Sequence, residues 1–295
     1  MFKSGYISII GKPNVGKSTL LNKLLGEKIA ITSKKPQTTR TNICGILTGK
    51  DYQLIFFDTP GIHKANKTLN KVMTSKIQRA IKDSDAVVFV TDEKGTIDEE
   101  VLAYFKMMKD IPSILVINKI ELFQDEKEIK ETEEKFLSYF PFKYVQKTSL
   151  IKNEGITELL SKIIEIVPSG PQYYPPEQIT TETERFIISE LIREKLIEKL
   201  KHEIPYSIAV QIEDIKYRQE RDVYYIKAVI FVEKESQKMI VIGENGKMLK
   251  EIGTMARKSI EAFLNCRVFL ELWVKIKHKW TKKEEWIKKL IHQRF

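Results

Sequence analysis

The stretch Gly11-Lys-Pro-Asn-Val-Gly-Lys-Ser18 matches the pattern GxxxxGK[ST] and decides the fold of the first half of the chain. It directly follows an apolar run, Tyr6–Ile10, and directly precedes a helical pattern that ends near Gly26. In a strand–loop–helix unit of this kind, the glycines let backbone N–H groups curl around a phosphate at a helix N-terminus. The sequence therefore predicts a nucleotide-binding α/β domain.

The residues of this loop share the work of binding a triphosphate. Lys17 is predicted to reach the β- and γ-phosphate oxygens, and Ser18 to coordinate Mg²⁺. Backbone N–H groups around the β-phosphate come from six consecutive residues, Asn14, Val15, Gly16, Lys17, Ser18 and Thr19. ATPases, small-molecule kinases and GTPases all use this loop, so other motifs must separate the three classes.

Two further motifs follow predicted strands. Asp58-Thr-Pro-Gly61 comes after Gln53–Phe57; there Asp58 can hold a magnesium-bound water, and the Gly61 N–H can meet the γ-phosphate. Asn118-Lys-Ile-Glu121 comes after Ser113–Ile117 and resembles the NKxD motif with which Ras-like GTPases recognise guanine. These positions at strand ends favour a GTPase.

Glu121 departs from the NKxD motif. An aspartate there accepts both N1–H and N2–H of guanine, a pattern that adenine does not offer. The glutamate keeps the charge but adds a methylene, so the carboxylate must retract or the loop must shift. Thr148-Ser149-Leu150 follows another strand, where GTPases place a loop behind the base, although Leu150 replaces the usual alanine. We predict that guanine is contacted by Asn118, Lys119, Glu121, Ser149 and Leu150.

Length, composition and charge limit the remaining choices. A chain of 295 residues is about twice the usual domain length, and 42% hydrophobic residues can fill sizeable cores. No apolar run approaches the roughly 18 to 20 residues of a membrane span, so we expect neither a transmembrane nor a secreted protein. The net charge of +10 gathers in residues 1–50, with nine basic residues and one acid, and in residues 234–295, with fifteen and seven. This distribution suggests an anionic partner.

Prolines mark the boundary between two domains, because four of the ten fall within Pro168–Pro176 and prevent regular structure there. We predict a nucleotide-binding domain at 1–168, a linker at 169–179 and a second domain at 180–295. In the first domain, helices alternate with strands, which gives a doubly wound sheet. The predicted strands are 6–10, 53–57, 86–90, 113–117 and 143–146, and the clearest helices are 69–81 and 156–167.

The second domain shows a different order, typical of a small α+β unit. A helix at 184–200 precedes strands at 207–215 and 223–232, a glycine loop, a helix at 247–263 and a strand at 268–276. The amphipathic stretch 282–291 is predicted to pack back as a helix with Trp286, Lys289 and Leu290 close together. Trp273 is expected to lie in the core or to form a partly buried platform, rather than to stack on a base.

The motifs together resemble one family. GKPNVGKSTLLNKLLG at 11–26, PQTTR at 36–40, DTPG and NKIE are similar to the Era branch of bacterial GTPases, of the TrmE-Era-EngA type, and the resemblance covers essentially the whole chain. It implies a P-loop GTPase domain followed by a type II KH RNA-binding domain, with Mg²⁺-dependent hydrolysis of GTP to GDP and phosphate. It also implies that a threonine of the TTR segment reaches Mg²⁺, Thr39 by position or Thr38 as the alternative, so the metal set is Ser18, Thr39 and Asp58.

The same resemblance implies slow catalysis. Ras-like proteins carry a water-orienting glutamine after DxxG, whereas this chain has Ile62, which cannot polarise water. We therefore expect intrinsic turnover on the order of 10⁻⁴ to 10⁻² s⁻¹. In related GTPases, an asparagine at the position of Asn14 helps to hold a K⁺ ion that supplies the missing charge, and capping of the loop is the alternative role. The catalytic set is Lys17, Thr39, Gly61 and Asn14.

The loop Gly243-Glu-Asn-Gly246 gains meaning from its context. Met239–Ile242 precedes it and a helix follows, within the helix–strand–strand–helix–helix–strand order of type II KH domains, whose GxxG loop clamps about four nucleotides of single-stranded RNA. Glu244 occupies the second position of the loop, where a basic residue would hold phosphate better. The alternative interpretation of the loop is a plain turn between two helices. The basic tail forms either a solvated end or an RNA-facing edge; it consists of Lys275, Lys277, His278 and Lys279. The predicted RNA-binding residues are Ile242, Gly243, Glu244, Asn245, Gly246, Lys247, Lys250 and Arg257.

The resemblance finally implies partners and a location. The expected RNA is the 3′ region of 16S rRNA, and the expected role is assembly and maturation of the 30S ribosomal subunit. A cytoplasmic monomer loosely attached to the inner face of the cell membrane is implied. Two alternatives stay open: an ATP-hydrolysing RNA-remodelling factor, which nucleotide competition would separate, and a ribosome-associated factor that binds GTP without turnover, which phosphate release would separate.

Overall fold

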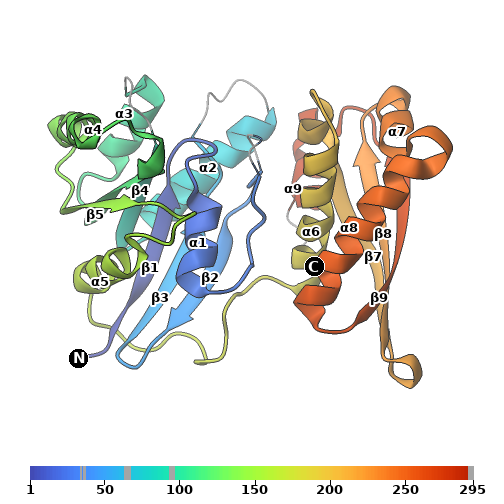
Figure 1. The fold of residues 1–295 in the computed structure, drawn as a ribbon, viewed down its shortest axis with the longest axis horizontal. Helices are drawn as coiled ribbons and strands as arrows, with labels where there is room; N and C mark the ends of the chain where they lie inside the picture. The colour runs from blue at the N-terminus through green and yellow to red at the C-terminus, as the bar shows by residue number, and fades with distance from the viewer. Residues whose placement is uncertain (34, 36–37, 63–67, 93–96, 292–295) are drawn as a thin grey trace. The chain divides into compact units, whose positions relative to one another are not determined.

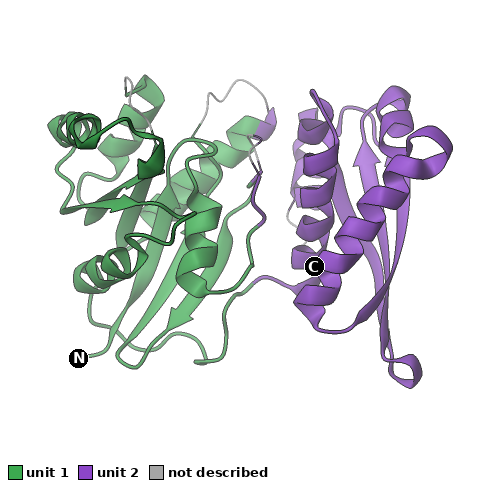
Figure 2. Ribbon diagram, viewed as in Figure 1, with its two compact units in different colours: residues 1–30, 39–66, 70–181 green, residues 31–38, 67–69, 182–295 purple. Residues whose placement is uncertain are grey.

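The computed structural model describes residues 1–33, 35, 38–62, 68–92 and 97–291. Contacts group the chain into two compact units, one of residues 1–30, 39–66 and 70–181 and one of residues 31–38, 67–69 and 182–295 (Figure 2). Pro36 and Gln37 of the PQTTR motif lie outside the described residues. Within the described ranges, no helix is both long and apolar enough to cross a membrane.

The first unit is a six-stranded sheet with helices on both faces, in the strand order β2-β3-β1-β4-β5-β6 (Figure 1). β2 runs antiparallel to β3, and the other neighbours are parallel. The strands are β1 (Lys3–Ile10), β2 (Ile43–Thr48), β3 (Tyr52–Asp58), β4 (Ala86–Thr91), β5 (Ser113–Asn118) and β6 (Tyr144–Thr148). The helices are α1 (Lys17–Leu25), α2 (Thr68–Lys82), α3 (Glu99–Met107), α4 (Glu126–Tyr139) and α5 (Ile156–Ile166), with a 3₁₀ turn at Ile120–Leu122. The predicted doubly wound sheet is confirmed.

Apolar side chains on one face of this sheet form a continuous core with α2, α3 and α4. Phe89 of β4 lies at its centre, with its ring 5.1 Å from that of Phe105 and 5.8 Å from that of Phe136. On the other face, α1 and α5 contact each other. Because β1, β3, β5 and β6 are parallel, their C-terminal ends lie at one end of the sheet, and the motifs that follow these strands meet there.

β2 is absent from the strands that the sequence predicts, and Gly45 explains why. A glycine in a short apolar run lowers the β propensity that the pattern reads. In the structure, a Cβ on Gly45 would lie 2.6 Å from Leu25 Cδ1 and 2.9 Å from Leu21 Cδ1 of α1. Glycine is thus required where α1 packs closely on the edge of the sheet.

The proline-rich segment is docked along this same edge. The Ile46 N–H donates to Ile179 O over 2.8 Å, and Gly45 forms an antiparallel bridge with Thr180. The buried Gln53 side chain binds the segment as well: its Oε1 accepts from the Tyr173 N–H at 2.7 Å and the Tyr174 N–H at 2.9 Å, and its Nε2 donates to Tyr174 O at 2.8 Å. The Gln53 side-chain amide therefore supplies hydrogen bonds to the part of the segment where prolines prevent strand pairing.

The second unit contains a three-stranded sheet in the order β7-β8-β9, with β7 antiparallel and β9 parallel to β8. Its strands are β7 (Ala209–Arg218), β8 (Val223–Val232) and β9 (Arg267–Ile276), and its helices are α6 (Glu184–Lys199), α7 (Glu235–Ile242), α8 (Lys247–Leu264) and α9 (Glu284–Ile291). Single 3₁₀ turns lie at Ile204–Ser207, Gln219–Arg221, Glu244–Gly246 and Trp280–Lys282. α6 packs on β7 and α8, and α8 packs on β9 (Figure 1). The predicted α+β order is confirmed.

Two local features of this unit refine the sequence predictions. The predicted last helix is present as α9, and the Lys289 ammonium lies 5.1 Å from the Trp286 ring. Trp273 is 51% exposed, so of its two expected places the core is wrong and the partly buried platform fits. The reason is register: Trp273 alternates with the buried-side residues Leu272 and Val274 on β9 and so falls on the face away from α8.

Replacing Gln53 by methionine should release the segment around Tyr173. The thioether keeps the length of the side chain but offers neither the acceptor for two backbone N–H groups nor the donor for Tyr174 O. We expect a loss of roughly 1–3 kcal/mol of unfolding free energy and faster chymotrypsin cleavage after Tyr173, since Pro175 blocks cleavage after Tyr174. Gln219→Met, at an exposed glutamine, is the matched control; equal cleavage of both variants would contradict the bracing role of Gln53.

Candidate functional site

The loop between β1 and α1 has the backbone of a phosphate cradle. Asn14 and Gly16 adopt positive φ angles of 65° and 107°, and α1 begins at Lys17 without a side-chain N-cap. The first N–H groups of a helix have no partner within the helix, so this end of α1 offers them, with the positive end of the helix dipole, to an anion. Val15 is buried beneath the loop, whereas Asn14 is exposed and Thr19 is half-buried.

The motif Asn118-Lys-Ile-Glu121 holds the phosphate loop through hydrogen bonds to two carbonyls of that loop. Asn118 Nδ2 donates to Val15 O over 2.7 Å, and Lys119 Nζ donates to Asn14 O over 2.7 Å. The approach is so close that a Cβ on Gly16 would lie 2.3 Å from Asn118 Nδ2. These hydrogen bonds and close contacts therefore fix the phosphate loop and the predicted base-binding motif to each other.

Two residues that the sequence analysis did not select orient this motif. Thr148 Oγ1 donates to Asn118 Oδ1 over 3.1 Å, and Asp92 pairs with the Lys119 ammonium. Both lie at or just beyond the C-terminal ends of parallel strands, β6 and β4. That position was a usable signal, because ligands of such sheets gather at these ends.

Ser18, Thr39 and Asp58 come together as the sequence predicts for a metal site. Ser18 Oγ donates to Asp58 Oδ2 over 2.6 Å and lies 2.9 Å from Thr39 Oγ1, which lies 3.3 Å from the same carboxylate oxygen. Thr38 Oγ1 instead donates to Lys35 O over 2.7 Å, so the geometry favours Thr39 over Thr38.

Asp58 is the least satisfied member of this group. Its side chain is fully buried, and its Oδ1 has no hydrogen-bond partner among the described residues. Burial raises the pKa of Asp58 to about 6, although Lys17, Ser18 and Thr39 each oppose the rise. A buried carboxylate with one bare oxygen, beside two hydroxyls, is an oxygen donor set that suits Mg²⁺.

Lys17 is buried beside this carboxylate. Its ammonium donates to Lys12 O over 2.7 Å and to Gly11 O over 3.1 Å. Burial lowers the pKa of Lys17 to about 8, an effect that Asp58 and Asp92 partly offset. An ammonium held by carbonyls and poorly solvated gains strongly from an approaching phosphate.

Gly61 and Ile62 close the phosphate side. A Cβ on Gly61 would lie 2.7 Å from Pro13 N, so only glycine lets this loop pass against the phosphate loop. The Ile62 N–H donates to Gly11 O over 3.0 Å, and its side chain is part of the core beneath α2. A side chain buried there cannot orient a water molecule, which agrees with the slow turnover predicted from sequence.

The predicted base side carries two further unsatisfied polar atoms. Glu121 Oε2 and Ser149 Oγ are both buried, and neither has a hydrogen-bond partner in the described part of the chain. Leu150 is buried too, and its Cδ1 would lie 3.3 Å from a Cβ on Gly16. A buried carboxylate oxygen without a partner costs free energy that a ligand N–H would recover.

The second site is the glycine loop between α7 and α8. Gly243, Asn245 and Gly246 have φ angles of 73°, 50° and 76°, and a Cβ on Gly243 would lie 2.6 Å from Met248 Cβ. Glycine is thus necessary at the first position on steric grounds. Glu244 and Asn245 project into solvent, and Ile242 ends α7 directly before the loop.

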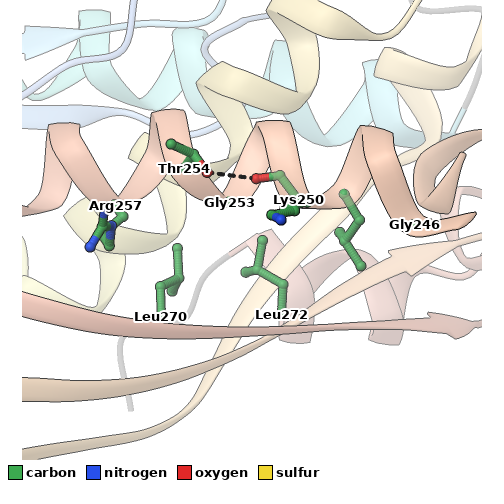
Figure 3. A pocket seen from close by; sticks show the side chains of 8 residues that line it. Gly246, Lys250, Gly253, Thr254, Arg257, Leu270 and Leu272 are labelled. Atoms are coloured by element: carbon green, nitrogen blue, oxygen red, sulfur yellow. Dashed lines mark hydrogen bonds between the residues drawn. The ribbon is translucent and has the colours of Figure 1, made fainter.

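A groove of about 400 Å³ runs from this loop between α8 and β9 (Figure 3). Leu270 and Leu272 of β9 point towards α8 and form an apolar floor, and Gly253 leaves space because it has no side chain. Lys250 and Arg257 line the α8 side, while Lys247 is exposed at the start of the helix. An apolar floor with cations along one wall suits bases whose phosphates face α8.

Family models match both units. Residues 6–119 match the family described as 50S ribosome-binding GTPase, and residues 203–281 match the KH domain. The two matched ranges contain the phosphate loop and the glycine loop respectively.

Curated relatives and solved structures match the chain over nearly all its length. GTPase Era of Thermoanaerobacter sp. (strain X514) is 45% identical over 98% of this chain and 96% of its own, and GTPase Era of Clostridium kluyveri is 44% identical over 98% and 99%. The crystal structure of a point variant of Aquifex aeolicus Era bound to GDP·AlF₄⁻ superposes with a TM-score of 0.93 at 35% identity, over 98% of this chain and 99% of that one. An Era structure with MgGDPNP and nucleotides 1506–1542 of 16S ribosomal RNA gives the same values.

Asp58→Asn should separate metal binding from folding. The amide can still accept from Ser18 but carries no charge, so the cost of burying a bare carboxylate disappears. We expect the ligand-free variant to unfold at an equal or higher temperature than wild type, while stabilisation by nucleoside triphosphate with Mg²⁺ is lost. Asp51→Asn, at an exposed carboxylate, should change neither. Thermal unfolding with and without EDTA measures both effects, and persisting Mg²⁺-dependent stabilisation of Asp58→Asn would remove Asp58 from the site.

Proposed function

Since the chain belongs to the Era family of GTPases, we propose that it binds and hydrolyses GTP at the phosphate loop and binds ribosomal RNA along the groove beside Gly243–Gly246. The observation that carries the first half is the set of buried atoms without partners in the described part of the chain: Asp58 Oδ1 on the metal side, and Glu121 Oε2 and Ser149 Oγ on the base side. These atoms bracket the cradle at the start of α1, as the two ends of a nucleotide require.

Each end of GTP then has a counterpart in the chain. The N–H groups of residues 14–19 surround the β-phosphate, and Lys17 leaves the carbonyls of Gly11 and Lys12 for the β- and γ-oxygens. Ser18, Thr39 and Asp58 would hold Mg²⁺, which when bound neutralises charge on the β- and γ-phosphates. The Gly61 N–H would meet the γ-phosphate, and the buried Ile62 side chain leaves the attacking water without a polar side chain from this position.

Guanine is favoured over adenine by the chemistry of the base side. Guanine presents N1–H and N2–H to a carboxylate, whereas the same edge of adenine lacks the N1–H donor. With adenine bound, Glu121 Oε2 would stay buried without a partner, which argues against the ATP-hydrolysing alternative. Asn118 and Lys119 also fix the position of the base side relative to the phosphate loop, because both donate hydrogen bonds to carbonyls of that loop.

The finer assignments follow from the family. We propose the 3′ region of 16S rRNA as the RNA and assembly and maturation of the 30S subunit as the process, supported by the relative solved with nucleotides 1506–1542 of 16S rRNA. Asn14, exposed at a positive φ in the phosphate loop, is proposed to help hold a K⁺ ion. A cytoplasmic monomer with loose attachment to the inner face of the membrane completes the proposal.

Glu121→Gln should weaken guanine binding selectively. The amide presents an NH₂ group where guanine also donates, so at least one donor is left unpaired, and affinity for GDP should fall by about 100-fold or more. Glu121→Asp is the matched control, because it restores the shorter carboxylate and should bind GDP at least as tightly as wild type. Competition against a fluorescent GDP analogue measures both; ATP competing as well as GTP with wild type would disprove the guanine assignment.

Removing Lys250 and Arg257 together should weaken RNA binding without changing basal GTP hydrolysis. If each neutralises one phosphate, Lys250→Ala/Arg257→Ala should lower affinity for single-stranded RNA and make the slope of log affinity against log salt shallower by about 1.4. Lys201→Ala, an exposed lysine outside the groove, should leave the slope close to that of wild type. Filter binding across a salt series gives the slopes, and an unchanged slope in the double variant would remove the groove from RNA recognition.

A further inference from the structure

We propose that the face of the β7-β8-β9 sheet opposite α6 and α8 is a second RNA-binding surface, which stacks bases of single-stranded RNA on Phe269 and Trp273. This outer sheet face comprises Arg218, Tyr225, Lys227, Phe269, Trp273 and Lys275. The inference rests on the proposed function, since it extends the path of the same RNA beyond the groove beside Gly243–Gly246.

Strand register separates the two faces of the sheet. Tyr225 pairs with Phe269, and Val229 pairs with Trp273, so these side chains share a face, whereas Val268, directly before Phe269, faces the helices and is buried. Phe269 is 54% exposed and Trp273 is 51% exposed. The Tyr225 ring lies 5.2 Å from that of Phe269, which extends the exposed aromatic area onto β8.

Cations lie among these rings. The Arg218 guanidinium lies 4.1 Å from the centre of the Tyr225 ring, and the Lys227 ammonium lies 6.0 Å from that of Trp273. Lys275, two residues beyond Trp273 on β9, lies on the same face by register. The aromatic residues are therefore flanked by cations from all three strands of the sheet.

Carboxylates also lie beside these cations. Glu213 accepts an ion pair from Lys275 at 2.8 Å and from Lys227 at 3.4 Å, so one carboxylate is shared by two ammonium groups. Glu271 accepts a hydrogen bond from the indole N–H of Trp273. Asp214 pairs in register with Lys227 and forms an ion pair with Lys216 at 2.7 Å on the same face. With these two residues included, four cations stand against three carboxylates, so the face carries more positive than negative charge around its aromatic residues.

This mixture of groups favours RNA over a protein as the occupant. Single-stranded nucleic acid is bound by aromatic rings that stack on bases and by Lys and Arg that meet the phosphates between them. The centre of a protein–protein interface is instead depleted of charged residues. Phe269 and Trp273 are four residues apart on one strand, about 13 Å at the usual rise, so each ring can serve a separate base.

The outer sheet face is continuous with the proposed groove through β9. This strand forms the edge of the sheet, and its residues alternate: Leu270 and Leu272 enter the groove, while Phe269 and Trp273 point away from it. RNA that leaves the groove across β9 therefore reaches the outer sheet face without crossing a helix.

The test compares short and long RNA on variants of the full chain. A fluorescent oligonucleotide of about six nucleotides from the 3′ region of 16S rRNA fills the groove alone, and one of about 20 nucleotides can also reach the outer sheet face. Phe269→Ala/Trp273→Ala should bind the long RNA at least about tenfold more weakly than wild type and the short RNA equally well. Tyr217→Ala is the control, because Tyr217 is 49% exposed on the same unit but alternates to the other side of β7.

A second variant tests the same surface without disturbing the packing around Trp273. Arg218→Gln/Lys275→Gln leaves both rings in place and should make the salt slope for long RNA shallower by about 1.4, with no change for short RNA. Circular dichroism and the unfolding midpoint establish that each variant is folded. Unchanged binding of long RNA by folded variants would overturn the proposal and leave this face to a protein partner; equal losses for both RNAs would overturn it as well. Failure of wild type to bind either RNA would instead refute the proposed function itself.

Discussion

The hydrogen bond from the Asn118 amide to the Val15 carbonyl holds the nucleotide site together. It joins the loop after β1 to the end of β5, and it requires glycine at position 16, where a Cβ would lie 2.3 Å from the amide nitrogen. Lys119 makes a second such bond to Asn14 O. Residues expected to touch only the base therefore also fix the shape of the loop that binds phosphate, so both ends of the nucleotide are recognised by one rigid assembly.

Several polar atoms of this rigid site are buried without a hydrogen-bond partner in the described part of the chain. Asp58 is buried with one bare oxygen, and burial shifts the pKa values of Asp58 and Lys17 towards each other, to about 6 and about 8. Groups in this state gain more from a ligand than solvated groups do, because the cost of removing them from water has already been met during folding. The ligand-free site is thus destabilised where Mg²⁺ and phosphate would bind.

Sequence predicted the site better than it predicted the edges of the fold. The phosphate loop, DTPG and NKIE have fixed spacing at strand ends, and the structure brings Ser18, Thr39 and Asp58 together as expected. β2 was missed because Gly45 weakens its pattern, and docking of the segment after Pro168 was missed because Gln53 looks like an ordinary strand residue. α7 received no bounds, since Met239–Ile242 is a run of apolar residues without helical period. For Trp273 the sequence left the core and a partly buried platform both open, because its apolar neighbours Leu272 and Val274 hid the alternation of β9.

In the proposed function, Glu121 recognises the guanine base, and Asp58 binds the Mg²⁺ ion at the phosphate end of the same nucleotide. The most direct measurement is a crystal structure of this chain with Mg²⁺ and a non-hydrolysable GTP analogue. The account predicts that the Glu121 carboxylate accepts from guanine N1–H and N2–H, and that Ser18, Thr39 and Asp58 surround the metal. A guanine ring bound away from Glu121, or a metal held without any contact to Ser18, Thr39 and Asp58, would contradict it.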